Sequence, residues 1–213
     1  MNEQANNSAS RSRLKERIVN VTMEAFMKHG IKSITMDDIA ASLGISKRTL
    51  YEVFPDKESL LEVCIRRGHE EFDDFVRGVL STTSNVMEVV LRIFQWNIRK
   101  FHATNKRFFE DIKKYPKACQ LMIGRRNRDS EEVVRFLEEG ARQGLFRDDI
   151  NFAITEYLMY NQLNLLMDSD TCNKYSFIEV YESIIFTFLR GISTEKGNHV
   201  LEEFITEYRR KQE

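Results

Sequence analysis

Residues 36–53 read MDDIAASLGISKRTLYEV and decide how the N-terminal part of the chain folds. Two short runs with apolar residues at helical spacing flank Gly44, and the second run is rich in basic and hydroxyl side chains. Gly44 permits a tight turn, and the small Ala40 lets two helices approach closely where they cross. The pattern predicts a helix-turn-helix held together by an apolar inner face: Ile39, Leu43, Ile45, Leu50 and Val53.

The predicted helices carry their own start signals. Thr35 is an N-cap candidate, and Asp38 three residues later forms a variant of the capping box. Ser46 caps the next helix, and Asp56, after Pro55, caps a fourth. These signals fix where the short helices begin. Because the apolar residues of the second run face inward, its other face is left exposed.

That outer face predicts contact with DNA. An exposed helix of this size fits the major groove of B-DNA, which is about 12 Å wide, and its N-terminal residues usually meet the base edges. Lys47 or Arg48 can donate to guanine, Thr49 can contact a base, and Tyr51 can reach a phosphate. The candidate DNA-binding residues are Thr35, Ser46, Lys47, Arg48, Thr49, Tyr51 and Lys57. Arg11, Arg13 and Arg17 can add a basic arm, and the alternative is that all these charges are an ordinary solvated surface.

Thr35 and Lys57 are included because each stands at a helix N-terminus, where free backbone N–H groups favour a phosphate.

The rest of the chain predicts an all-α protein. Only 2 Pro and 9 Gly occur in 213 residues, and helical apolar periodicity recurs to the C-terminus. Residues 1–10 are polar and aperiodic and predict a disordered tail. The further helices are expected at about residues 12–29, 86–101, 106–113, 117–143, 150–167, 176–192 and 194–210.

Several function classes lack support in the sequence. Three scattered Cys and four isolated His form no metal-binding pattern, so we expect no metal and no cofactor. No phosphate-binding loop, nucleophile elbow or dinucleotide-binding fingerprint occurs, which argues against an enzyme. No apolar run is long enough for a membrane span and the first ten residues lack an apolar signal core, so a cytoplasmic protein is expected.

Residues 30–67, GIKSITMDDIAASLGISKRTLYEVFPDKESLLEVCIRR, closely resemble the N-terminal domain of the TetR family of transcriptional regulators. The resemblance implies that Ser46, Lys47, Thr49 and Tyr51 face DNA and that Thr35 and Lys57 hold phosphates. Two departures stand out. Glu52-Val53 replaces residues that are often aromatic or His in the family, and Arg48 occupies a position that is often small, which suggests an added contact.

The resemblance also implies an all-helical C-terminal domain that binds a small effector and dimerises, here through helices near residues 150–168 and 176–192. The apolar stripe from Phe177 to Ile192 independently needs a partner helix, either within the chain or on a second copy. Asn161 is the most specific candidate for an effector-binding residue, because an amide on an apolar face needs a hydrogen-bond partner. The full set of pocket candidates is Trp96, Phe101, Tyr115, Met122, Phe136, Tyr157 and Asn161.

The residues and the resemblance together predict a dimeric regulator that binds a double-stranded DNA operator. The resemblance implies that it is a repressor released from this operator by a small molecule. Its expected organisation is a tail at residues 1–10, a DNA-binding domain at 11–57 and an effector-binding and dimerisation domain at 58–213. The alternative is a helical protein-interaction module without specific DNA binding.

Overall fold

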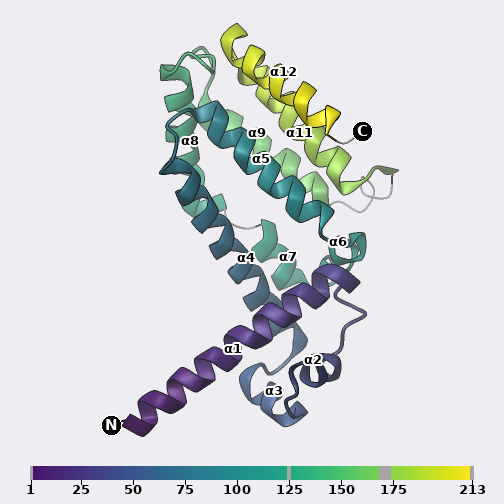
Figure 1. Cartoon of the computed structure of the whole chain (residues 1–213). Helices are drawn as coiled ribbons and strands as arrows, with labels where there is room; N and C mark the ends of the chain where they lie inside the picture. Colours follow the sequence, from purple (N-terminus) through teal and green to yellow (C-terminus); the bar gives the residue numbers. More distant parts are fainter. Residues whose placement is uncertain (1, 124–125, 168–173, 212–213) are drawn as a thin grey trace. The chain divides into compact units, whose positions relative to one another are not determined.

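The computed structural model describes residues 2–123, 126–167 and 174–211, and this part of the chain is built from helices (Figure 1). The first helices are α1 (Asn2–His29), α2 (Met36–Leu43), α3 (Lys47–Val53), α4 (Lys57–Leu80), α5 (Val86–His102) and α6 (Lys106–Ile112). The later ones are α7 (Pro116–Ile123), α8 (Arg126–Arg142), α9 (Phe152–Leu163), the 3-10 turn η1 (Asn164–Met167), α11 (Phe177–Ile192) and α12 (Glu195–Arg210). The described residues contain no β-strand, only an isolated bridge between Phe146 and Ser193, so the predicted all-α class is confirmed.

Ser46 caps its helix as predicted, and three later helices begin in the same way. Ser46, Asn151, Ser176 and Thr194 each accept a backbone hydrogen bond from the first turn of the helix that follows. Two expectations differ from the structure. The first helix begins at Asn2, so residues 2–10, expected as a disordered tail, extend α1. The single helix expected over 117–143 is two helices, because α7 ends at Ile123 and α8 begins at Arg126, and apolar periodicity alone does not mark such a boundary.

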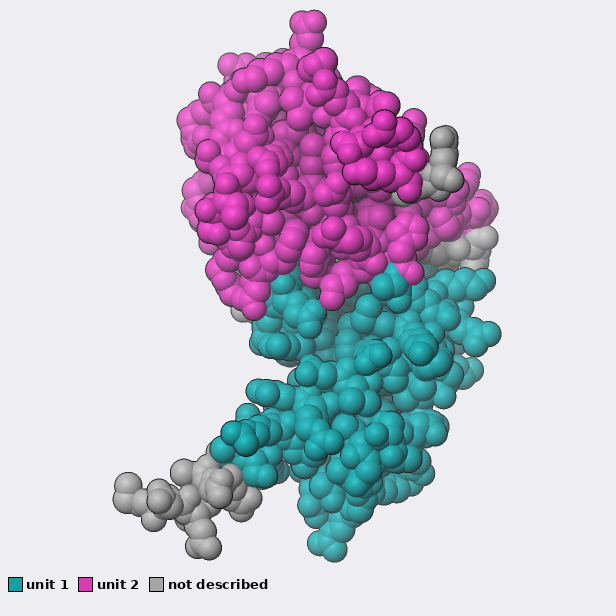
Figure 2. Space-filling model, viewed as in Figure 1, with its two compact units in different colours: residues 1–72, 103–123 teal, residues 73–102, 124–213 magenta. Residues whose placement is uncertain are grey.

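The chain forms two compact units (Figure 2). Unit 1 comprises residues 1–72 and 103–123, and unit 2 comprises 73–102 and 124–213. The boundary expected after residue 57 therefore falls inside unit 1, which also includes α6 and α7. The predicted assignment of DNA binding to 11–57 and of effector binding to 58–213 stays a functional prediction.

Unit 1 has a core that joins its long first helix to the two short helices. α1 packs against α2 and α6, and α2 packs against α3. Ile18, Phe26, Ile39 and Leu50 are almost completely buried there. Each such apolar side chain contributes about 1.5–3 kcal/mol when it leaves water, so the short helices depend on this packing.

Unit 2 is centred on aromatic side chains from α5, α11 and α12. Phe94 of α5 lies 4.8 Å from Phe186 and 5.8 Å from Tyr181, measured between ring centroids, and both partners belong to α11. Phe204 and Tyr208 of α12 also contact the Phe94 ring, at 5.9 and 5.3 Å. Aromatic pairs at these separations are attractive beyond the area that they bury, so they fix how the three helices pack.

The apolar stripe of α11 finds most of its partners within the chain. Val180, Tyr181, Ile184, Leu189 and Ile192 are all buried, and α11 packs against α5, α9, α12 and η1. The larger exposed apolar surface lies instead on α9 and η1, where the exposed side chains are Ile154, Tyr157, Leu158 and Leu165. These four recur at helical spacing, so they share one face.

Candidate nucleic-acid interface

The turn between α2 and α3 is fixed by Gly44. Its φ of 66° is left-handed, a conformation that glycine adopts without steric cost. The Gly44 N–H donates to the Ala41 carbonyl at 3.1 Å, and the Ile45 N–H donates to the Ala40 carbonyl at 3.0 Å. With Leu50 of α3 fully buried, the two helices form one rigid piece that leaves the outer face of α3 exposed.

The start of α2 carries the predicted capping box. The Asp38 N–H donates to the Thr35 hydroxyl at 3.1 Å, while the Thr35 N–H and hydroxyl donate to one Asp38 carboxylate oxygen at 2.8 and 2.6 Å. These hydrogen bonds from Thr35 lower the pKa of the Asp38 carboxyl. Because both Thr35 donors are engaged, a phosphate at this helix start would have to bind the N–H groups of Met36 and Asp37.

The outer face of α3 carries its two basic side chains in exposed ion pairs. Lys47 Nζ lies 2.8 Å from an Asp37 carboxylate oxygen, and Arg48 Nε lies 3.0 Å from Glu52 Oε1. The hydrogen bond from Lys47 to Asp37 and the charge of that carboxylate raise the pKa of Lys47. Exposed pairs of this kind are weak because water screens them, so both cations can exchange a carboxylate for a phosphate or a base.

The hydroxyl residues of α3 divide into two roles. Ser46 accepts the Thr49 N–H at 3.0 Å, and the two hydroxyl oxygens lie 2.8 Å apart, so Ser46 and Thr49 hold the helix start. Tyr51 is 42% exposed. The side chain of Tyr51 is therefore available to a partner, as the sequence predicts.

The predicted basic arm lies on α1. Arg11 Nη2 donates to the Glu52 carbonyl at the end of α3 at 3.3 Å, and Lys15 Nζ lies 6.0 Å from the Phe54 ring centroid. Arg13 and Arg17 are exposed. Arg11 and Lys15 therefore link α1 to the end of α3, next to the proposed reading face.

Lys57, which the sequence predicts to hold a phosphate at the start of α4, is not a fully exposed cation. It is half-buried, and its Nζ lies 5.6 Å from the ring centroid of the buried Phe26. Burial lowers the pKa of Lys57, while the carboxylates of Asp111 and Asp38 act in the opposite direction. Asp111 belongs to α6 and lies far from the motif in sequence, so motif reading could not have found it.

The seven effector-pocket candidates are divided between the two units. Tyr115 and Met122 belong to unit 1, whereas Trp96, Phe101, Phe136, Tyr157 and Asn161 belong to unit 2. Within unit 2, Trp96 stacks on Phe75 at 5.5 Å and lies under Lys100 Nζ at 5.2 Å, and Phe101 makes edge contacts with Phe177 and Tyr181. Phe136 packs on the hydrophobic core of unit 2.

The argument for Asn161 as a buried amide is wrong. Asn161 and Tyr157 are exposed, and the Asn161 amide donates to the Tyr157 carbonyl of its own helix at 2.8 Å. The polar pair that does lie among the aromatic rings is Asn97 and Tyr181, where the Asn97 amide donates to the Tyr181 hydroxyl at 2.8 Å. Burial raises the pKa of Tyr181 to about 12. The only signal for this pair in the sequence is that Asn97 follows Trp96 on an amphipathic helix.

Residues 2–123, 126–167 and 174–211 lack two further kinds of feature. This part of the chain holds no group of three His, Cys, Asp or Glu side chains placed to bind a metal ion. Nor does it contain a helix with both the length and the apolar character needed to cross a membrane.

Residues 18–64 match the family described as "Bacterial regulatory proteins, tetR family". The matched segment runs from the buried part of α1 through α2 and α3 into α4, and so includes all seven candidate DNA-binding residues from Thr35 to Lys57 but not the basic arm. The N-terminal part of this chain is a helix-turn-helix DNA-binding domain of the TetR family. The chain is accordingly a transcriptional regulator.

Two relatives extend the likeness beyond the N-terminal domain. The uncharacterized HTH-type transcriptional regulator YvaF of Bacillus subtilis is 27% identical over 184 residues, which cover 85% of this chain and 96% of YvaF. The HTH-type transcriptional repressor KstR2 of Mycolicibacterium smegmatis is 27% identical over 146 residues, 64% of this chain and 69% of KstR2. Both relatives are named as regulators of transcription rather than as enzymes.

A solved structure shares the fold of this chain. It is a putative transcriptional regulator from Saccharomonospora viridis in complex with choline, with a TM-score of 0.63 and 19% identity. The alignment covers 86% of this chain and 100% of that one. The arrangement of helices is therefore shared over most of the length.

Proposed function

We propose that this regulator is a homodimeric repressor that reads its operator with α3 and leaves the operator when a small molecule binds unit 2. The observation that carries the proposal is the rigid presentation of α3, whose outer face bears Lys47, Arg48 and Tyr51. Because its target is DNA, we expect it to act in the cytoplasm. The named repressor KstR2 supports repression as the direction of control.

The reading role of α3 is tested with Arg48→Ala. A duplex enriched from a random pool by the wild-type protein serves as the probe. Fluorescence anisotropy measures its Kd and the Kd of a scrambled duplex, and the ratio of the two is the sequence preference. A side chain that donates to a base contributes about 1–3 kcal/mol of discrimination, so Arg48→Ala should reduce the preference by about 5- to 150-fold.

Arg135→Ala is the matched control, because Arg135 also forms an exposed i,i+4 ion pair, with Glu131 on α8 in unit 2. It should leave the preference unchanged. If the random pool yields no enriched sequence with pure dimer, specific DNA reading is refuted and the protein-interaction alternative gains support.

Dimerisation is proposed through the exposed apolar face of α9. Ile154 is 57% exposed and Leu158 is 56% exposed, although both are large apolar residues on one helix face. Two half-sites of an operator need two reading helices about 34 Å apart, which a dimer supplies. α11 is the second helix proposed for the interface, although most of its apolar stripe is buried within the chain.

The dimer is tested with Leu158→Glu in sedimentation velocity. A charge in an apolar interface is strongly unfavourable, so the variant should sediment as a monomer where the wild type is a dimer. Leu80→Glu is the control, since Leu80 is also half-exposed but lies at the end of α4. A dimeric Leu158→Glu protein would refute this face as the interface.

Effector binding is proposed among the aromatic side chains of unit 2, with Asn97 and Tyr181 as the polar anchors. A largely apolar lining with a few polar groups is typical of small-molecule sites. Trp96, the only Trp in the chain, lies on the same helix as Asn97 and reports binding through its emission. Choline is a first probe, since the similar regulator was solved with it, within a panel of neutral and cationic metabolites.

A compound that changes Trp96 emission should also weaken operator binding by the wild type and should lose both effects in Asn97→Leu. Compounds that bind unit 2 and leave operator affinity unchanged would contradict release as the mechanism.

A further inference from the structure

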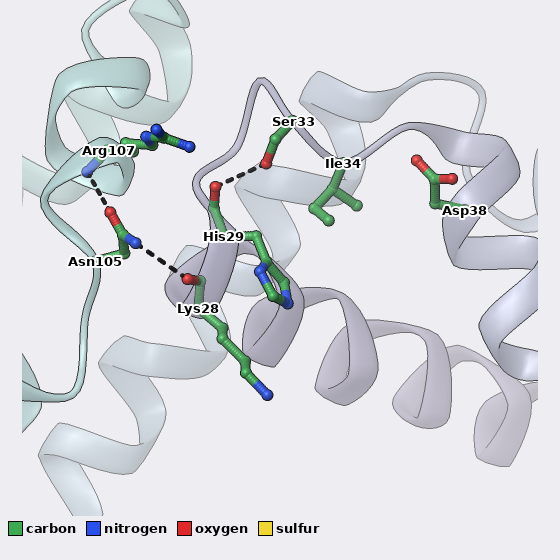
Figure 3. A pocket seen from close by; sticks show the side chains of 7 residues that line it. All are labelled: Lys28, His29, Ser33, Ile34, Asp38, Asn105 and Arg107. Carbon is green, nitrogen blue, oxygen red and sulfur yellow. Dashed lines mark hydrogen bonds between the residues drawn. The ribbon is translucent and has the colours of Figure 1, made fainter.

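An open groove lies in unit 1 where the end of α1, the segment before α2 and the start of α6 meet (Figure 3). Its volume of about 480 Å³ is that of a small-molecule site, but such sites are mostly apolar, and Ile34 is the only apolar side chain among the described residues that line this groove. The lining therefore suits a charged occupant. We call it the α1–α6 groove, and its lining includes Lys28, His29, Ser33, Ile34, Asp38 and Arg107.

Two cations stand at the start of α6 against the local preference of a helix. Lys106 and Arg107 belong to the first turn of α6, where the helix dipole is positive and disfavours basic side chains. Both are exposed, and within the described residues neither forms an ion pair with a carboxylate. Charges that break a local rule without a local gain are expected where they serve a function.

Hydrogen bonds hold Arg107 against the end of α1. The Asn105 N–H donates to the Met27 carbonyl at 2.7 Å, and the Asn105 amide donates to the Lys28 carbonyl at 3.2 Å (Figure 3). The Asn105 side-chain oxygen accepts the Arg107 N–H at 3.0 Å. Gly30 permits the close approach, because a Cβ there would lie only 2.8 Å from Arg107 Cβ. The Arg107 side chain therefore extends from a fixed base toward the end of α1.

The carboxylates at the groove are already engaged by other donors. One Asp38 oxygen accepts the Thr35 N–H and hydroxyl at 2.8 and 2.6 Å. One Asp111 oxygen, beside Gly30, accepts the Lys32 N–H at 2.7 Å. Because these hydrogen bonds offset part of the negative charge, the groove presents cations that no carboxylate of the described residues neutralises.

We propose that the α1–α6 groove binds the phosphate backbone of DNA that flanks the operator half-site, with Arg107 and Lys28 as the contacts. The groove reaches the start of α2, since Ile34 and Asp38 line it, and the start of α2 is where a phosphate is already expected. Arg and Lys bind phosphates through charged donors, without regard to base sequence. The inference rests on the proposed DNA-binding function and adds a contact from outside the helix-turn-helix.

Duplex length separates this contact from the reading of bases by α3. The core duplex is the enriched duplex trimmed to the shortest length that keeps the sequence preference, and the extended duplex adds about 10 base pairs, one helical turn, on each side. The wild type should bind the extended duplex more tightly and with a steeper salt dependence. Each phosphate contact adds about 0.9 to the slope of log K against log salt, so one contact from each of two subunits adds about 12-fold to the change in Kd between 50 and 200 mM salt.

Four variants assign this length effect to the groove. Arg107→Gln and Lys28→Gln should each remove about 12-fold of the added salt dependence on the extended duplex. Arg107→Lys keeps the charge and should keep the effect. Lys114→Gln is the matched control, because Lys114 is an exposed cation of unit 1 outside the groove lining, and it should leave the length effect unchanged.

Fluorescence anisotropy at several salt concentrations measures both duplexes, and urea unfolding checks each variant. Arg107→Gln should not lower the urea midpoint, because the helix dipole disfavours a cation there, and a lowered midpoint would assign Arg107 to the fold and overturn the inference.

Three further results would overturn the inference: a wild type without a length effect, an Arg107→Gln protein that keeps it, or an equal loss in Lys114→Gln. In each case the sequence preference on the core duplex would leave the proposed function standing. A wild type without any preference for the enriched duplex would overturn both.

Discussion

Substitution of Gly30 by Ala should destabilise the protein more than the same substitution at Gly44. Both glycines have a left-handed φ, +86° at Gly30 and +66° at Gly44, so Ala brings a dihedral cost of about 1–2 kcal/mol at either position. The surroundings differ. A Cβ at Gly44 meets nothing within 4 Å, whereas at Gly30 it would lie 2.8 Å from Arg107 Cβ and 3.2 Å from an Asp111 carboxylate oxygen.

The close approach adds a second cost at Gly30. Two carbon atoms at 2.8 Å must move apart, and overpacking of this kind typically costs about 1–3 kcal/mol. The movement would strain the junction that Asn105 and Asp111 make with the end of α1. Gly44→Ala should therefore lose about 1–2 kcal/mol and Gly30→Ala about 2–5 kcal/mol of unfolding free energy.

Urea unfolding followed by far-UV circular dichroism measures both losses. The variants must be compared at one protein concentration, because the stability of a dimer depends on it. A Gly30→Ala protein that loses no more stability than Gly44→Ala would refute the close packing of α6 on the end of α1.

Three further predictions concern the helix-turn-helix and its surroundings. Leu50→Ala removes a fully buried side chain from α3 and should cost about 2–5 kcal/mol in urea unfolding, whereas a loss below about 1 kcal/mol would mean that α3 is not anchored there. Hydrogen bonds from Thr35 lower the pKa of the Asp38 carboxyl from its ordinary 3.8. The capping box therefore stabilises the fold at a pH above 3.8, and this stabilisation is lost as the pH falls through the lower pKa of the folded state. The gap in melting temperature between the wild type and Thr35→Ala should therefore narrow on acidification below about pH 4, and a constant gap would contradict the assignment. Burial raises the pKa of Cys64 to about 12, so a thiol reagent at about pH 8 should label Cys64 only after unfolding. The Cys119→Ser, Cys172→Ser protein keeps Cys64 as its one thiol, and rapid labelling of this protein would contradict the burial of Cys64.

The sequence by itself determined the local elements of the DNA-binding unit. The Thr35–Asp38 box, the Ser46 cap, the Gly44 turn and the buried Leu50 involve residues only a few positions apart or a simple helical periodicity. Interactions of this range depend on side-chain chemistry and helix geometry, which the order of residues specifies directly. The all-α class followed from the same local signals, and the TetR resemblance followed from the motif that they form.

Tertiary packing decided what lies around that motif. The hydrogen bond between Lys32 and Asp111 joins residues 79 positions apart, and it exists because α6 returns to unit 1 after α5 has left it. No periodicity indicates that Lys57 lies over Phe26, that Asn161 is exposed, or that the α11 stripe is mostly buried while the α9 face is open. A helical pattern shows that a face is apolar, but which neighbour covers that face depends on packing between distant segments, since the hydrophobic effect has no direction of its own.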